Sequence, residues 1–195
     1  MKKGIALTVI VVGIVLFGWI YGFRLTESGA IPGNVQILNS SKTVYGKAVL
    51  FEDSVNDSFG VARLKQYLGF LYQYDGGSNG YSVAKDKPFQ VTGYGSSETK
   101  QAFVVGVKTA VDSNIKYIAV GNHLEDLSRV EKYELTLDDV YKHKEKYQVA
   151  EVVNHYTLFV LDQYSEDNWT FRAFDANGKL IADQLFAAEA RYIDW

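Results

Sequence analysis

The sequence N-W-T-F-R-A-F-D, residues 168–175, decides the fold class because apolar and polar side chains alternate along it. Trp169, Phe171 and Ala173 fall on one face of an extended strand, and the polar residues between them fall on the other. This period of two residues is typical of an antiparallel sheet with one face in the core and the other in water. The stretch I-K-Y-I-A-V, residues 115–120, alternates in the same way.

Similar short segments, rich in β-branched and aromatic residues, recur along the chain with turn residues about 8 to 12 positions apart. They predict strands at residues 47–52, 59–67, 70–74, 89–94, 101–110, 115–121, 130–135, 148–153, 156–162, 169–174 and 180–184. No long helical crossover separates them, so we do not expect a parallel α/β sheet.

One segment is helical in pattern. Thr136 followed by Asp139 forms a capping-box variant, and it predicts a short helix over residues 137–146. The tail, residues 185–195, is a second and weaker helical segment. The expected fold is mainly β: an antiparallel sandwich or barrel-like domain with one or two short helices, preceded by a single N-terminal transmembrane helix.

The N-terminal run, residues 4–23, contains twenty residues without a charge. As a helix it would span about 30 Å, which is the thickness of one hydrocarbon core. Lys2 and Lys3 precede it, so the positive-inside rule places the N-terminus in the cytoplasm. We expect a signal-anchor that contacts the lipid bilayer through residues 4–23, and a single-pass protein of the cell membrane with its C-terminal domain outside.

Two processing signals overlap after this run. Ser28-Gly29-Ala30 is spelled like a signal-peptidase site, but the apolar region of a cleaved signal peptide is about 7–15 residues long. Gly22-Phe23 resembles a pilin cleavage site, but the hydrophobic helix precedes it here instead of following it. We expect an uncleaved anchor, and cleavage after Ala30 stays open as an alternative.

The expected domains are residues 1–23 (cytoplasmic lysines and anchor), 24–45 (stalk and lead-in) and 46–195 (extracytoplasmic antiparallel β domain). The absence of cysteine excludes disulfides, thiolate metal sites and a lipid-anchored cysteine. Without the two N-terminal lysines, 18 basic residues remain against 23 acidic ones, a net charge of −5. We therefore expect no nucleic-acid partner, and the overall charge does not favour anionic lipid either.

The polar motifs of the chain favour structural roles. The turn residues D-A-N-G-K, residues 175–179, predict a hairpin turn and lack the ligands of a calcium loop. The glycine-rich residues 74–81 predict a mobile connection between strands. The three histidines and the acidic pairs show no metal or catalytic spacing: His123, His143, His155, Glu52-Asp53 and Glu166-Asp167. We predict no catalytic residue, no metal site and no cofactor.

Tyrosine is the remaining candidate for recognition, with 14 copies in the chain. Tyr72 and Tyr74 would share a strand face, and Tyr81 and Tyr94 lie near them in sequence. Exposed tyrosines on a sheet can stack on glycans or grip a peptide. These four residues are the predicted ligand-binding set, although tyrosine is also favoured in ordinary strands.

A resemblance to known proteins rests on three features: the anchor, the absence of cysteine and two stretches of sequence. The stretches are S-F-G-V-A-R-L-K-Q-Y-L-G (residues 58–69) and A-F-D-A-N-G-K-L-I (residues 173–181). The chain resembles the small, uncharacterised membrane-anchored extracytoplasmic proteins of Bacillus-like Gram-positive bacteria. The resemblance implies a location in the cell envelope, and it implies no activity and no functional residue.

The sequence thus favours a non-catalytic binding, accessory or sensory domain that meets an envelope protein or glycan. The alternatives are an envelope hydrolase acting on wall polymer or peptide, and a purely structural envelope protein.

Overall fold

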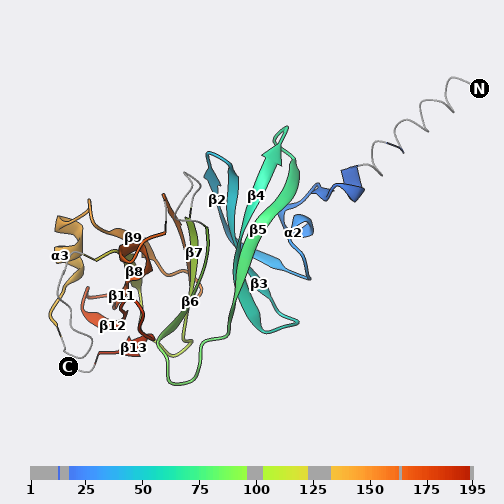
Figure 1. The fold of residues 1–195 in the computed structure, drawn as a ribbon. Coiled ribbons are helices and arrows are strands. Elements are labelled where there is room, and N and C mark those ends of the chain that lie inside the picture. The colour runs from blue at the N-terminus through green and yellow to red at the C-terminus, as the bar shows by residue number, and fades with distance from the viewer. Residues whose placement is uncertain (1–12, 14–17, 96–102, 123–132, 163, 194–195) are drawn as a thin grey trace, which may run out of the picture.

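The protein is a mainly β structure of three stacked antiparallel sheets, seen in a computed structural model that describes residues 13, 18–95, 103–122, 133–162 and 164–193 (Figure 1). Sheet A has the strand order β1-β5-β4-β3-β2, sheet B the order β10-β7-β6, and sheet C the order β13-β12-β11-β8-β9. Every strand pair within them is antiparallel, as the alternating pattern predicts.

Along the chain the strands build sheet A first, then sheet B, then sheet C. One strand, β10, returns from sheet C to sheet B. Sheet A contains β1 Phe23–Arg24, β2 Gln36–Thr43, β3 Gly46–Asp53, β4 Ser58–Tyr67 and β5 Leu71–Tyr81. Sheet B contains β6 Phe89–Tyr94, β7 Phe103–Thr109 and β10 Tyr156–Leu161. Sheet C contains β8 Tyr117–Val120, β9 Gln148–Glu151, β11 Phe171–Phe174, β12 Leu180–Gln184 and β13 Arg191–Tyr192. The helices with described bounds are α2 Glu27–Ala30, α3 Leu137–Lys142 and the 3-10 turn η1 Asp167–Trp169, and residues 18–20 are also helical.

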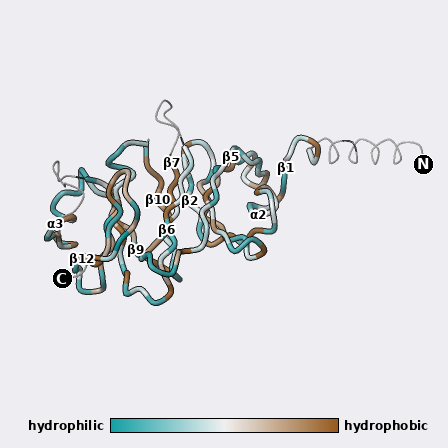
Figure 2. Tube along the Cα trace, turned by 60° about the horizontal axis from the view of Figure 1, so that its bottom comes forward, coloured by the Kyte–Doolittle hydropathy of each residue, from teal (hydrophilic) through white to brown (hydrophobic). Residues whose placement is uncertain are grey.

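Sheet B lies in the middle of the stack and has apolar side chains on both faces. Along β7, Val105 and Val107 pack toward sheet C, whereas Val104 packs against Leu50 and Val61 of sheet A. Figure 2 shows apolar residues on the strands where the sheets face one another. Both edge strands of sheet B contact sheet A, β6 through β5 and β10 through β2. The two sheets therefore curl around their shared core.

Each outer face of the stack is covered by a short helix. On sheet A, Ala30 and Ile31 at the end of α2 pack on Val49, Phe51 and Leu64. On sheet C, two residues of α3 pack with Phe174 and Leu180; these are Leu137 and Val140. The capping box predicted at Thr136 and Asp139 is present, but α3 ends at Lys142, earlier than expected.

The alternation of residues 168–175 is confirmed, but the expectation of a wet second face is wrong. Trp169, Phe171 and Ala173 face the core between sheets B and C. Arg172, on the opposite face, is also fully buried, because the segment around α3 covers sheet C. Alternation shows that two faces differ in polarity, and it does not show that one of them is open to water.

Several element boundaries differ from the sequence prediction. The glycine-rich residues 74–81, expected as a mobile connection, belong to β5 and pair with β4. The predicted stalk, residues 24–45, contains α2 and the edge strand β2, whose exposed polar side chains resemble those of a linker. The tail forms β13 instead of a helix as far as the structure describes it. Residues 133–135 are not a strand, and the rest of the strand predicted at 130–135 lies outside the described residues.

Candidate binding surface

The four predicted tyrosines separate into three places. Tyr81 is 82% exposed at the end of β5, and Tyr74 is 39% exposed near the middle of the same strand. Tyr72 and Tyr94 are only partly buried, and both pack against core clusters. Tyr72 and Tyr74 share one face of β5, as predicted, because they pair with Gln66 and Leu64 in uninterrupted register. Tyr74 also lies near enough to Tyr94 to be influenced by it, whereas Tyr81 lies at the far end of β5.

Tyr72 supports the outer face of sheet A. Its ring packs with the α2 cluster and lies under Lys47, whose Nζ is 5.7 Å from the ring centroid. Gln66 Nε2 donates a hydrogen bond of 3.3 Å to the Tyr72 hydroxyl. These contacts occupy the ring and the hydroxyl, so Tyr72 has a packing role.

Tyr94 forms a compact polar cluster with three residues of sheet A, Arg63, Lys65 and Asp75. Its hydroxyl donates to the carbonyl of Asp75 at 3.2 Å, and the guanidinium of Arg63 lies 4.9 Å from its ring centroid. Arg63 Nη2 is 3.3 Å from Asp75 Oδ2, and Lys65 Nζ is 2.9 Å from Asp75 Oδ1. We call Arg63, Lys65, Asp75, Tyr74 and Tyr94 the tyrosine–arginine cluster.

The electrostatics of this cluster centre on Asp75. Its hydrogen bond with Lys65 raises the pKa of that lysine above its ordinary value. Partial burial, with a smaller contribution from Tyr94, raises the pKa of the Tyr74 phenol above its ordinary value. Arg63 Nε and Nη1 are buried without a hydrogen-bond partner, so Asp75 and the Tyr94 ring compensate this cation only in part.

Glycine at position 76 lets the cluster form. Gly76 has φ +114°, a backbone conformation that favours glycine, and a Cβ there would overlap the Tyr94 hydroxyl. The next residue, Gly77, lies so close to the carbonyl of Val61 that a side chain would also collide. The glycines that looked like a flexible connection therefore allow β4, β5 and β6 to approach closely.

Sequence reasoning missed the charged members of this cluster. Arg63 and Lys65 alternate with Ala62 and Leu64 in β4, a pattern that marks one polar strand face. That pattern is visible in the sequence, but the sequence prediction places their partner Asp75 in a mobile connection. The ion pair can be predicted only if the segment that carries the carboxylate is first recognised as the strand next to β4.

A second polar cluster is buried on the outer face of sheet C. Asp183, fully buried, accepts hydrogen bonds from Arg191 Nε at 2.8 Å and Nη2 at 3.2 Å. Arg172 pairs with Asp183 in register, donates to the Gly121 carbonyl, and lies 5.6 Å from the ring centroid of Tyr133. Burial raises the pKa of the Tyr133 phenol, which lies close to both Arg172 and Asp183. These groups are enclosed, so the cluster serves the fold.

Two hollows lie on the sheet C side. One, of about 580 Å³, is lined by the start of α3 and the turn at residues 175–179, which is the hairpin turn that the sequence predicts. The other, of about 620 Å³, is strongly polar and includes the carboxylates Glu145, Asp162, Glu166 and Asp167. Across the parts of the chain that the structure describes, no three His, Cys, Asp or Glu residues are grouped so that they could hold a metal ion.

The other motif residues have local structural contacts. Glu52 accepts hydrogen bonds from Lys108 and from the Tyr156 hydroxyl, and Asp53 accepts from Asn56. His155 lies in the turn before β10, His143 caps the end of α3, and His123 lies outside the described residues. Comparison of the chain with protein-family models, curated proteins and solved structures found no match.

The predicted anchor falls largely outside the described residues. Within residues 13, 18–95, 103–122, 133–162 and 164–193, no helix is long and apolar enough to cross a bilayer.

Proposed function

We propose that the chain is a single-pass membrane protein that holds its three-sheet domain outside the cytoplasm, where the domain binds an envelope protein or glycan without catalysing a reaction. The uncharged run of residues 4–23 would form the anchor. The tyrosine–arginine cluster and Tyr81 would supply the contacts to the partner.

The observation that carries this proposal is the way in which the chain enters sheet A. β1, Phe23–Arg24, pairs with Gln73 and Tyr72 of β5 directly after the apolar run. Thr26 caps α2, and Ala30 and Ile31 are buried on sheet A. Cleavage after Ala30 would remove β1 and α2 from the domain, so this architecture supports an uncleaved anchor.

A binding role is supported by aromatic and charged side chains that lie together at the surface. Lys65, whose side chain is 50% exposed, pairs with Asp75, whose side chain is 22% exposed, and Tyr74, the residue before Asp75 in β5, is 39% exposed. An aromatic ring beside donors and acceptors is the combination that grips sugar rings and peptide groups. A purely structural envelope protein would not need it.

The hydrolase alternative has one observation in its favour. The second hollow gathers Glu166 and Asp167 with two further carboxylates, and glycoside hydrolases use carboxylate pairs. Solvated carboxylates at a turn are the simpler explanation, so we place the binding function first.

The test is a pull-down from envelope extracts with the full-length protein. Tyr74→Ala and Tyr81→Ala should each reduce the retained partner or polymer. Tyr141→Ala, which removes a tyrosine on α3 that is 43% exposed, about as much as Tyr74, should not. Retention of nothing by the unchanged protein would refute the binding function. The location is tested separately: the protein should stay in the membrane fraction with its domain open to external protease, and a released form starting at Ile31 would refute the anchor.

A further inference from the structure

We infer that one end of sheet A docks onto the surface of the bilayer that the N-terminal run enters. The docking surface consists of the tips of two hairpins, Val44, Tyr45, Tyr67, Leu68 and Phe70, which we call the apolar end of sheet A. The partner is the interfacial region of an anionic bilayer, and the inference rests on the proposed anchor.

The two hairpin tips lie at the same end of the sheet. In the register of β3 and β4, Lys47 pairs with Leu64, so the β2–β3 turn lies beside the last residues of β4. The tip of the β4–β5 hairpin is closed by Gln66 Nε2, which donates to the Gly69 carbonyl at 2.8 Å. Figure 1 shows both tips at the top of sheet A, and the β3–β4 turn is at the opposite end.

These tips expose more apolar surface than ordinary turns do. Val44 is 90% exposed, Leu68 81% and Phe70 53%. Turn positions normally hold polar residues or glycine, because their side chains point into water. A cluster of exposed large apolar side chains marks an interaction surface.

The exit of the apolar run is fixed to this same end. The Phe23 ring contacts the Tyr67 ring edge to face at 5.3 Å between centroids. Gln73 Nε2 donates to the Tyr21 carbonyl at 3.0 Å, and the Tyr67 hydroxyl donates to Gln73 Oε1 at 3.3 Å. Trp19 and Ile20, just before, are also exposed. The place where the chain enters the bilayer is therefore continuous with the hairpin tips.

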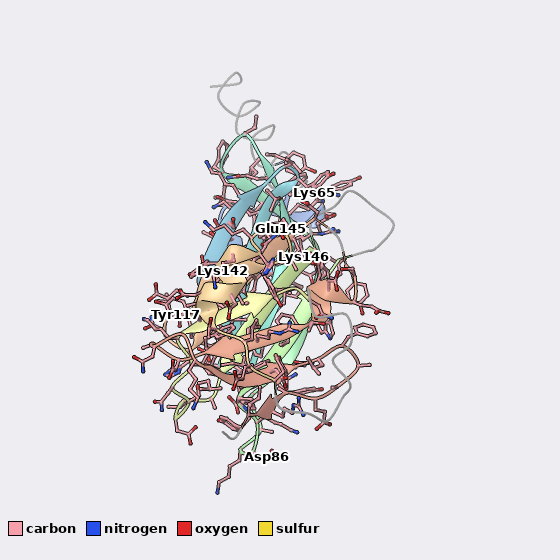
Figure 3. All side chains as sticks on the ribbon, turned by 90° about the vertical axis from the view of Figure 1, so that its left-hand side faces the viewer. Lys65, Asp86, Tyr117, Lys142, Glu145 and Lys146 are labelled. Carbon is pink, nitrogen blue, oxygen red and sulfur yellow. The ribbon has the colours of Figure 1, made fainter. Side chains whose placement is uncertain are left out.

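Positively charged side chains predominate at this end, which suits the surface of an anionic bilayer, although the whole domain is acidic. Residues 19–25, 42–47 and 65–73 contain four cations, Arg24, Lys42, Lys47 and Lys65, and no acidic residue. Glu27 and Asp75 pair with Lys47 and Lys65. Among the described residues no carboxylate pairs with Arg24, whose Nη1 donates to the Trp19 and Phe23 carbonyls, or with Lys42, so these two cations are the ones offered to lipid headgroups. Figure 3 shows Lys65 near this end and Asp86 at the far end of the molecule. Aromatic and basic residues together favour the membrane interface.

The absence of cysteine from the chain provides a clean test. Leu68→Cys in the full-length protein, labelled with an environment-sensitive fluorophore, is reconstituted in phosphatidylcholine–phosphatidylglycerol vesicles. The matched control is Val55→Cys, an exposed valine in the β3–β4 turn at the opposite end of sheet A. We expect blue-shifted emission at position 68, quenched by nitroxide lipids at least twofold more than emission at position 55.

Each other outcome overturns the inference. Equal emission and quenching at the two positions, in protein that floats with the vesicles, would refute docking and leave the anchor in place. A blue shift at position 68 without lipid quenching would mean that a second copy covers this end. Protein that fails to float with the vesicles would refute the anchor and the docking with it.

Discussion

At the scale of single residues, the most unusual feature is a buried carboxylate that faces two buried or half-buried guanidinium groups. Arg172 and Asp183 are fully buried in sheet C, and Arg191 approaches Asp183 from the edge with both Nε and Nη2. A buried cation is tolerated only if its charge is compensated nearby. Asp183 is therefore the residue on which the outer face of sheet C depends.

We expect Asp183→Asn to destabilise the protein by about 3–5 kcal/mol, because the amide keeps the shape of the side chain but leaves Arg191 without its paired carboxylate and removes the negative charge across the strand pair from the buried Arg172. Denaturant unfolding followed by fluorescence measures this loss. The control is Glu151→Gln, which removes the carboxylate of an exposed pair with Lys116 and should leave the unfolding midpoint unchanged. Equal midpoints for the two variants would show that the Asp183 charge is dispensable.

The sequence could predict the strand that carries Arg172 but not the environment of its side chain. In F-R-A-F, the arginine alternates with core residues, which is also the pattern of an exposed residue. Its burial depends on Tyr133 and Tyr147, which lie more than 20 positions earlier in the chain and stack on its guanidinium. Local patterns do not carry that tertiary information.

At the scale of elements, β5 is notable because it runs as one strand through a glycine-rich stretch and pairs with β4 along it. The run D-G-G-S-N-G has low strand propensity, which favours a loop in any local prediction. The structure uses it as a strand because Phe59 and Tyr94 occupy the space that side chains would fill. Propensity is overridden here by a requirement for close approach, which only the neighbouring strands reveal.

We expect Gly76→Ala to cost about 1–3 kcal/mol more than Gly69→Ala in free energy of unfolding. Both glycines have positive φ, +114° and +81°, so both substitutions strain the backbone. Only at Gly76 would the new Cβ overlap the Tyr94 hydroxyl, whereas Gly69 has open space around it. Chemical denaturation of the two variants makes the comparison, and equal costs would contradict the close packing of β5 on β6.

At the scale of the whole molecule, the fold class and most strands could be predicted, but the stacking could not. Alternation along 168–175 and 115–120 predicts antiparallel strands, and the structure has them. It does not tell which strands share a sheet, or that β10 returns to pair with β7 after the excursion through β8 and β9. Of the four predicted tyrosines, Tyr74 and Tyr94 come near each other because β5 of sheet A lies against β6 of sheet B, a contact that neither strand's own sequence shows.

The last prediction concerns the segment between the apolar run and the first long strand. A stalk would contribute nothing to stability, but residues 23–31 pair with β5 and bury Ile31 to 4% exposure over Val49 and Leu64. Burial of the isoleucine alone stabilises the fold by about 1.5–3 kcal/mol. We therefore expect a variant that begins at Val35 to unfold at lower denaturant than one that begins at Tyr21.

Both truncated variants lack residues 1–20 and differ by residues 21–34, so the comparison measures what β1, α2 and Ile31 contribute. Ile31→Ala in the longer variant is the matched intermediate case, and it should fall between the two because it removes the apolar contact but keeps the pairing of β1. If the variant that begins at Val35 were as stable as the longer one, residues 23–31 would act as a flexible tether. The apolar end of sheet A would then have no fixed orientation relative to the bilayer, because the pairing of Phe23–Arg24 with β5 is what ties the exit of the run to the hairpin tips.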